Sequence, residues 1–203
     1  YAPFSFISPL GEPSGLLVDL WNAWSEETGR TVRFRLSDWQ GTLEAMRKGY
    51  ADIHSGLFFS DERDWWLDFS APIHLIPSAL YGPASSASPT AADLNGKRVG
   101  VLRGTFQQGY LQDNVPGAEL VLFDVDAPMV LALLKGEIDY LFNEVIQTDT
   151  TLARLGYAGL VRRGETLITN ELFAAVGQGK ADLLDTINYG FESIPKEELS
   201  RIE

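Results

Sequence analysis

Apolar residues follow a helical spacing in some segments of the chain and an alternating one in others. In residues 13–29 (PSGLLVDLWNAWSEETG) they recur on one helix face, and Gly29 is typical of a helix end. Residues 31–36 (TVRFRL) alternate apolar with polar side chains, which predicts a half-buried strand. A second helix is predicted over 42–49 (TLEAMRKG), and a short buried strand over 51–57 (ADIHSGL).

The same alternation of strands and helices continues after a stretch rich in Ser, Ala and Pro. That stretch, residues 82–96, is expected to be a loop that leads into a second unit. The elements predicted beyond it are strands at 97–102, 119–123, 137–142 and near Leu160, and helices after Thr105, over 127–136, through Thr151, over 181–191 and after Pro195. Strands separated by helices indicate parallel sheets, so the expected fold class is α/β.

Two segments share one local pattern, which favours two similar lobes. Residues 43–53 (LEAMRKGYADI) and 130–140 (VLALLKGEIDY) each combine a helix, Lys-Gly-x-x-Asp and a strand. The glycine provides a left-handed helix end, a joint that is common in any α/β protein. One copy lies on each side of the Ser/Pro-rich stretch, and a cleft between two such lobes is a natural place for a small ligand.

Composition excludes several classes of function. The formal charge of −12 argues against a nucleic-acid partner and against docking on anionic lipid, because both need clustered Lys and Arg. The absence of cysteine excludes disulfides and thiolate sites, and no apolar run reaches the ~20 residues of a membrane helix. His54 and His74 lack metal-site spacing, so we expect no metal, no cofactor and no catalytic residue.

Two segments carry candidate binding chemistry. In residues 56–70 (GLFFSDERDWWLDFS), Arg63 lies among four acids and five aromatics. It is either an anion-binding residue or a surface arginine over a core made by the aromatic side chains that follow it. In VGVLRGTF, Gly104 and Thr105 stand between a strand and a helix, where backbone N–H groups and the helix dipole favour an anion. A tight turn without ligand is the alternative there.

Segments over the whole chain resemble one known family. They are YAPFSF, GLLVDLW, KGYADIHSGLFFSDER, LDFSAPI, DLNGKRVGVLRGT, KGEIDYLFNE and INYGFESIPKEEL, in this order. They are similar to the family 3 solute-binding proteins, which are periplasmic amino-acid-binding proteins, and most similar to the variants that serve as sensor domains of membrane-bound diguanylate cyclases or histidine kinases. The resemblance implies a two-lobed periplasmic-binding-protein (Venus flytrap) fold of type II, with lobe 1 at 1–79 and 175–203 and lobe 2 at 80–174.

The resemblance also implies ligand-binding positions. Arg63 matches the arginine that clamps a ligand carboxylate, a task that suits the bidentate guanidinium fork. Glu144 matches the acid that meets the ligand ammonium. The other matched positions are Tyr1, Trp39, Ser55, Gly56, Phe58, Ser60, Thr105 and Phe106. In this chain Phe58 and Phe106 stand where the family has hydroxyl side chains, and Glu144 is longer than the family's aspartate.

The expected function is extracytoplasmic, in the periplasm: closure around a small ligand that carries a carboxylate, with one anionic end and a flat or apolar body. As a sensor, the parent protein is expected to be membrane-anchored through a segment after the C-terminus. A substrate-binding protein of an ABC amino-acid importer is the first alternative. A dehydratase on the same fold is the second, although the sequence shows no acid/base pair for it.

Overall fold

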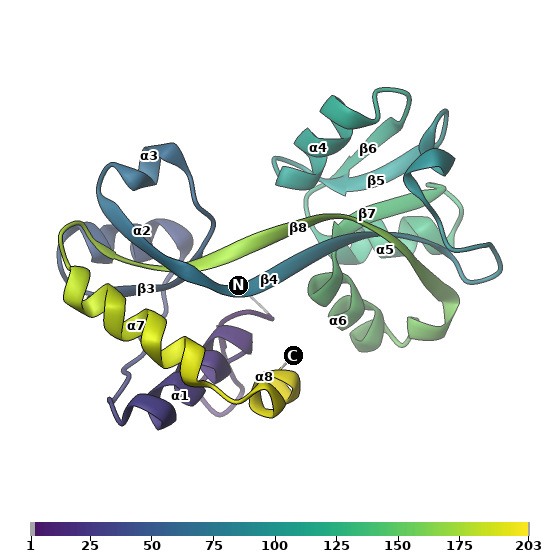
Figure 1. The fold of residues 1–203 in the computed structure, drawn as a ribbon. Helices are drawn as coiled ribbons and strands as arrows, with labels where there is room; N and C mark the ends of the chain where they lie inside the picture. The colour runs from purple at the N-terminus through teal and green to yellow at the C-terminus, as the bar shows by residue number, and fades with distance from the viewer. Residues whose placement is uncertain (1–2, 203) are drawn as a thin grey trace. The chain divides into compact units, whose positions relative to one another are not determined.

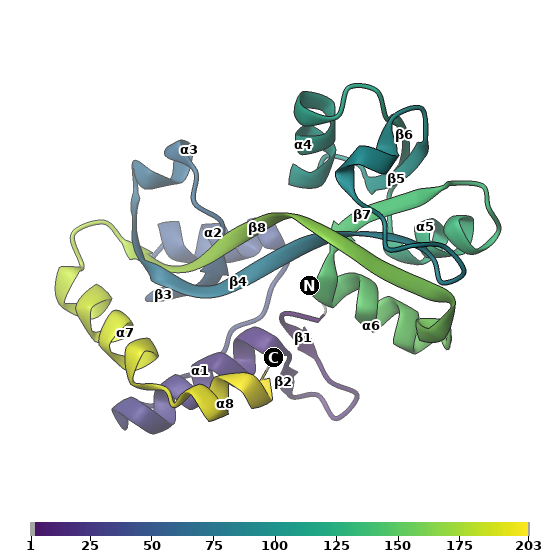
Figure 2. The same ribbon diagram turned by 45° about the vertical axis from the view of Figure 1, so that its right-hand side comes forward.

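The structure, a computed structural model, describes residues 3–202. The chain divides into two compact units, here called unit 1 (residues 3–75 and 171–202) and unit 2 (residues 76–170). It passes from one to the other within two 17-residue strands, β4 (Leu67–Pro83) and β8 (Val161–Gly177). Figures 1 and 2 show the elements of each unit from two directions. No helix among the described residues is long and apolar enough to cross a membrane.

Unit 1 is formed by the first and the last part of the chain. Its elements are β1 (Phe6–Ile7), β2 (Pro13–Ser14), α1 (Leu16–Thr28), α2 (Trp39–Arg47), β3 (Ile53–Leu57), α3 (Asp61–Asp64), α7 (Ala181–Ser193) and α8 (Lys196–Ile202). Strands β1 and β2 form a small antiparallel hairpin, and β3 pairs antiparallel with the last part of β8. Helix α1 packs against α7 and α8, as both views show.

Aromatic contacts fix the helices of unit 1 to one another. Trp21 is 2% exposed, and its ring lies 5.0 Å from that of Phe191 on α7. Trp24 is also buried, and its indole nitrogen donates to the carbonyl of Ile187 at 3.0 Å. Because these large rings stand at helical spacing on one face of α1, that face must be covered, and α7 covers part of it.

Unit 2 is a sheet with helices on both faces. After β4 its elements are a 3₁₀ turn (Ala91–Leu94), β5 (Arg98–Leu102), α4 (Phe106–Asn114), β6 (Glu119–Phe123), α5 (Asp126–Leu134), β7 (Tyr140–Glu144), α6 (Val145–Leu155) and a second 3₁₀ turn (Ala158–Leu160). Strand β5 lies between β6 and β7 and is parallel to both, whereas β4 pairs antiparallel with β7.

Successive side chains along β4 and β7 pack into two separate cores, one on each face of the unit 2 sheet. On β7, Leu141 packs with residues of α5 and α6, and Phe142 packs on the opposite face with Leu111 of α4. On β4, Tyr81 and Leu80 divide in the same way. This follows from the period of two along a strand, and it explains why the central strands have apolar residues at successive positions.

The structure confirms most predicted elements and corrects three expectations. Residues 31–36 are not a strand, although their alternation of half-buried and exposed residues persists. The sheets are not purely parallel, because β3 and β4 form antiparallel pairs. The Ser/Pro-rich stretch is also more ordered than a loop: β4 continues to Pro83, and a 3₁₀ turn lies within it. The 17-residue length of β4 was missed because Pro72 and Pro77 interrupt its pattern.

The packing of α7 on α1 predicts a cost for any side chain at Gly190. A Cβ there would collide with the indole of Trp24 and the methyl of Thr28. We expect Gly190→Ala to destabilise unit 1 by about 1–3 kcal/mol, as overpacking does, measured by thermal or urea unfolding. The matched control is Gly109→Ala on α4, where a Cβ meets nothing within 4 Å. It should be neutral or stabilising by up to about 1 kcal/mol, and equal losses in the two variants would contradict the packing argument.

Candidate functional site

Arg63 is held in place within unit 1 by a carbonyl and an aromatic ring. Its Nη1 donates to the carbonyl oxygen of Phe58 at 2.8 Å. Its guanidinium carbon lies 5.1 Å from the ring centroid of Trp39. The side chain is half-buried, and the acids at 61, 62 and 64 are exposed. The ring and the carbonyl together fix the plane of the guanidinium, so its orientation is set before any ligand arrives.

A short helix presents Arg63. The backbone N–H groups of Arg63 and Asp64 donate to the carbonyl of Ser60 at 2.9 and 3.0 Å, which forms the single turn of α3. The hydroxyl of Ser60 makes no capping hydrogen bond to this turn. Trp66, two residues after the turn, packs partly buried against the core that contains Leu67, whereas Trp65 is 82% exposed. Trp65 is therefore not part of the core below Arg63.

Trp39 begins the helix that lines the other side of Arg63. The carboxylate of Asp38 accepts from the backbone N–H of Gly41 at 2.7 Å and caps α2, which places Trp39 in the first turn. The Trp39 ring is 45% exposed and stands edge-on to the ring of His54, with centroids 5.6 Å apart. An exposed indole with a guanidinium over one face forms an apolar surface next to a positive charge.

His54 packs against Trp39 from strand β3. It is buried on β3, and its Nε2 lies 3.2 Å from the hydroxyl of Thr42 on α2. Burial, with a smaller effect of the nearby Arg63 charge, lowers the pKa of His54 to about 4. The ring is therefore neutral at pH 7.

Ser55 and Gly56 follow His54 on β3, and both are half-buried. The carbonyl of Ser55 accepts from the indole nitrogen of Trp21 at 2.8 Å. A Cβ at Gly56 would press against side-chain atoms of Leu17 and Leu172. Glycine is therefore needed here for close packing.

Unit 2 carries the second group of predicted residues. Gly104 has a φ of +71°, and its N–H donates to the side-chain oxygen of Gln108 at 2.8 Å. The hydroxyl of Thr105 donates to the carbonyl of Leu102 at 2.7 Å and accepts from the N–H of Gln108 at 3.4 Å, which caps α4. Both groups expected to hold an anion thus also shape the turn. Phe106, the first residue of α4, is 63% exposed.

Glu144 ends β7 and is 7% exposed. It lies opposite Ser78 of β4 in the sheet register. The hydroxyl of Ser78 accepts from the side-chain amide of Gln107, the residue after Phe106, at 2.8 Å. Ser78 and Gln107 thus connect the start of α4 to the end of β7. Neither was predicted from the sequence, because a serine and a glutamine 29 residues apart show no pattern.

A buried polar network fixes the end of β7. The amide nitrogen of Asn143 lies 3.1 Å from a carboxylate oxygen of Asp126 and 3.2 Å from the hydroxyl of Thr148. The amide of Gln147 donates to the other Asp126 oxygen at 2.8 Å. Burial raises the pKa of Asp126. These contacts hold the backbone beside Glu144 from both α5 and α6.

The structure brings the predicted residues into two groups. Trp39, Phe58, Ser60 and Arg63 form the unit 1 group, with Ser55 and Gly56 on β3 of the same unit. Thr105, Phe106 and Glu144 form the unit 2 group. Tyr1 lies outside the described residues. No cluster of three or more metal-ligating side chains occurs within residues 3–202.

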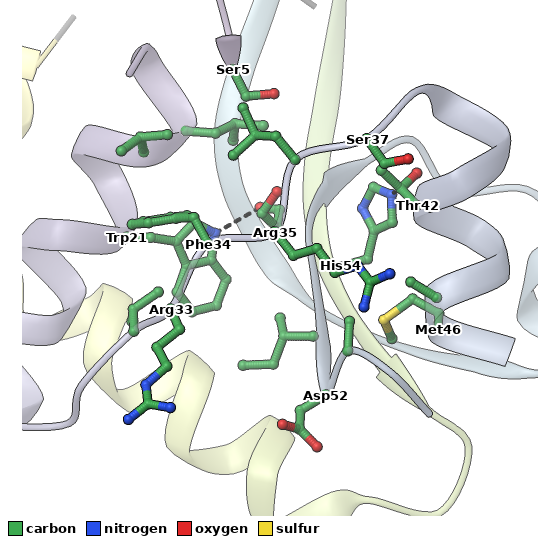
Figure 3. Close-up of a pocket in the computed structure, with 18 of the residues that line it drawn as sticks. Ser5, Trp21, Arg33, Phe34, Arg35, Ser37, Thr42, Met46, Asp52 and His54 are labelled. Carbon is green, nitrogen blue, oxygen red and sulfur yellow. Dashed lines mark hydrogen bonds between the residues drawn. The ribbon is translucent and has the colours of Figure 1, made fainter. Parts of the chain in front are cut away.

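A large cavity of unit 1 does not coincide with the group around Arg63. It has a volume of about 1220 Å³ and is lined by residues 5–7, 30–37 and 50–55 together with parts of α1 and α2. Figure 3 shows Trp21, Phe34, Arg35 and His54 around it, with the Trp21 hydrogen bond drawn as a dashed line. Neither Arg63 nor Trp39 lines this cavity.

A family model for bacterial extracellular solute-binding proteins, family 3, matches residues 1–203. The chain belongs to this family. The two-lobed Venus flytrap fold expected from the sequence is therefore confirmed, and so is a binding function for small molecules. The family is one of non-catalytic binding domains, which agrees with the expectation that the chain is not an enzyme.

The relatives include transport and sensor proteins. The chain is 28% identical to the L-cystine-binding protein TcyJ of Escherichia coli, over 97% of this chain and 75% of TcyJ. It is 27% identical to the L-arginine-binding protein of Pseudomonas aeruginosa, over 96% of this chain and 79% of that one. It is similar to a solved histidine kinase sensor domain, with a TM-score of 0.73, 27% identity, and coverage of 100% of this chain and 90% of that one.

The lowered pKa of His54 predicts a specific loss of stability in acid. Below pH 6.5 the unfolded histidine binds a proton that the folded one binds only near pH 4. The free energy of unfolding should fall as pH drops through this window, by about 3 kcal/mol at most from this group. Urea unfolding at pH 7 and pH 4.5 should show a smaller acid loss in His54→Gln than in the wild type. The same difference in both proteins would contradict a buried neutral His54.

Proposed function

We propose that this chain is an extracytoplasmic ligand-binding domain that closes around an amino-acid-like carboxylate and serves as the sensor of a membrane-bound receptor. The observation that carries the proposal is the fixed Arg63, bonded to the carbonyl of Phe58 and stacked on Trp39. A guanidinium has five donors in a rigid fork, and the bond to Phe58 uses one of its nitrogens, so the fork can also pair with a carboxylate.

The unit 2 group supplies the opposite charge. Glu144 is buried at the end of β7 next to the Gln107–Ser78 pair. Pairing with a cation offsets the desolvation cost of a buried carboxylate, and the α-ammonium group of a ligand is such a cation. A ligand that meets Arg63 with its carboxylate and Glu144 with its ammonium would be an amino acid or a close analogue. Similarity to an L-cystine-binding protein and to an L-arginine-binding protein supports this class.

The aromatic residues of the two groups define the rest of the ligand. Phe58 and Phe106 replace hydroxyl side chains of the family, and Trp39 and Phe106 are exposed at 45% and 63%. Exposed rings gain free energy when an apolar group covers them, at about 25 cal/mol per Å². We therefore propose a ligand with a flat or apolar body, bound more tightly than glycine or serine.

Closure would be the output of binding. We propose residues 1–79 with 175–203 as one lobe and 80–174 as the other, and a hinge in the two strands that connect the units. A ligand that binds both groups stabilises the closed form by its differential affinity. Movement of α8 (Lys196–Ile202) would then reach a membrane segment. Similarity to a histidine kinase sensor domain supports this output.

The alternative is a substrate-binding protein of an ABC amino-acid importer. Similarity to the L-cystine- and L-arginine-binding proteins favours it. The full sequence of the encoded protein decides between the two. A membrane span followed by a cyclase or kinase domain supports the sensor. A signal peptide with a single binding domain supports the importer. Both place the domain in the periplasm.

The anchor role of Arg63 predicts a loss of binding without a loss of folding. The tightest ligand is first found by a thermal-shift screen of amino acids, dicarboxylates and aromatic carboxylates. Calorimetry should then show that Arg63→Ala weakens this ligand by about 2–5 kcal/mol, because its carboxylate loses a desolvated partner. Arg162→Ala removes an exposed arginine of unit 2 that donates to the carbonyl of Ala84, and it should bind as the wild type does. Unchanged affinity in Arg63→Ala, with normal circular dichroism, would exclude the anchor.

Closure predicts a change of size in solution. Small-angle scattering should give a smaller radius of gyration when the tightest ligand of the screen is saturating than when it is absent. Glu144→Gln should reduce the change at the same ligand concentration, because the unit 2 group loses its charge. An identical radius with and without ligand in the wild type would contradict a closing domain.

A further inference from the structure

Strand β6 forms one edge of the sheet in unit 2. It stands last in the order of strands there and pairs only with β5. The register with β5 runs from Glu119 to Phe123 without a bulge. Glu119 is exposed and the other four residues of β6 are half-buried. The edge of a strand carries unpaired N–H and C=O groups on which another chain can add a strand.

Two hydrogen bonds at the ends of β6 show which of its backbone groups face β5. The N–H of Glu119 donates to the carbonyl of Lys97 at 2.8 Å. The carbonyl of Phe123 accepts from the N–H of Arg103, also at 2.8 Å. Because backbone groups alternate in direction along a strand, the first, third and fifth residues of β6 bond to β5. The second and fourth residues direct their groups away from β5.

These outward residues are Leu120 and Leu122. No loop, turn or side chain among residues 3–202 bonds to their N–H or C=O groups. Proteins commonly protect an exposed edge with lysine, proline or a β-bulge. The sequence of β6, ELVLF, contains neither of these residues, and its register has no bulge. The edge is therefore open to a further strand.

A second copy of the same edge fits it in antiparallel orientation. In a register centred on Val121, Leu120 of one copy lies opposite Leu122 of the other. Each outward N–H then meets an outward C=O of the second copy, as in a hydrogen-bonded antiparallel pair. The two Val121 residues face each other on the two-fold axis. The interface is thus self-complementary, which is the requirement for a two-fold dimer.

The charges of this register favour a second copy as the partner. The chain has a formal charge of −12, so two copies repel each other wherever acid would face acid. In the register centred on Val121, Glu119 lies opposite Phe123 and Asp124 lies opposite Ala118. Like charges directly opposite each other would destabilise strand pairing, and this register contains none. The β6 edge is therefore a place where two acidic copies can meet.

We infer that β6 pairs with β6 of a second copy of this chain, antiparallel about Val121, and forms a two-fold dimer. The dimer depends on unit 2 alone and not on the identity of the ligand. A five-residue edge gives a small interface, whereas stable interfaces bury about 1,200–2,000 Å². The dimer is therefore weak, with a Kd of roughly 10 µM to 1 mM.

Sedimentation equilibrium of the purified protein tests the dimer. Between about 10 µM and 1 mM protein, the average mass should rise from that of a monomer towards that of a dimer. Raising NaCl from roughly 50 to 500 mM should lower the Kd about threefold or more, because salt screens the repulsion between two acidic copies.

A proline variant tests the edge itself. Leu122→Pro removes an outward N–H and no hydrogen bond to β5, and proline is tolerated on an edge strand at such a position. It should raise the Kd about tenfold or more and leave the circular dichroism unchanged. Ala87→Pro, in an exposed loop of unit 2, is the control and should dimerise as the wild type does.

Hydrogen exchange in the wild type gives a second readout that does not depend on the folding of a variant. The backbone amides of Leu120 and Leu122 should exchange more slowly as the protein concentration rises. The amide of Val121 bonds to β5 in the monomer as well, so its exchange should not change with concentration.

Three results would overturn the inference. One is a monomer over the whole concentration range. Another is a folded Leu122→Pro variant that dimerises as the wild type does, because the dimer would then use another surface. The third is exchange at Leu120 and Leu122 that does not depend on concentration, and this result decides the question if Leu122→Pro does not fold.

Discussion

The proposed site depends on keeping one guanidinium in a fixed orientation. Arg63 lies on a helix of only four residues, which by itself would not hold a long side chain still. The carbonyl of Phe58 and the ring of Trp39 restrict it instead, and Trp39 is in turn held by the cap of α2 and by the edge of His54. The Arg63 side chain therefore loses its conformational entropy when the protein folds, not when the ligand binds. This lowers the entropic cost of binding and favours affinity.

The same physical logic applies in unit 2, where the fixed group is an acid. Glu144 terminates a strand whose neighbours on both faces are large apolar side chains. Asn143, Thr148 and Asp126 secure the backbone beside it, and Gln107 bonds Ser78 on the adjacent strand. Two opposite charges, each prepared on its own scaffold, are what a zwitterionic ligand requires.

The sequence predicted the elements whose signal is local, and it missed those that depend on distant partners. The helical spacing of α1 and its end at Gly29, which has a φ of 65°, were both found. The long strands β4 and β8 were not, because prolines interrupt β4 and strand pairing is not local. Residues 31–36 show the converse: their alternation predicts a strand, but a strand forms only where a neighbour exists. Of the residues matched to family motifs, those in the described part of the chain fall into two groups, whereas Gln107 and Ser78 have no sequence signal.

The central claim is that one ligand engages both groups. An NMR titration with the tightest ligand of the screen tests it most directly, with the Trp39 indole and the Arg63 side chain as probes of unit 1 and the Gln107 side-chain amide as the probe of unit 2. All three signals should shift, and they should give the same Kd. Shifts confined to one unit, or two different Kd values, would contradict the account.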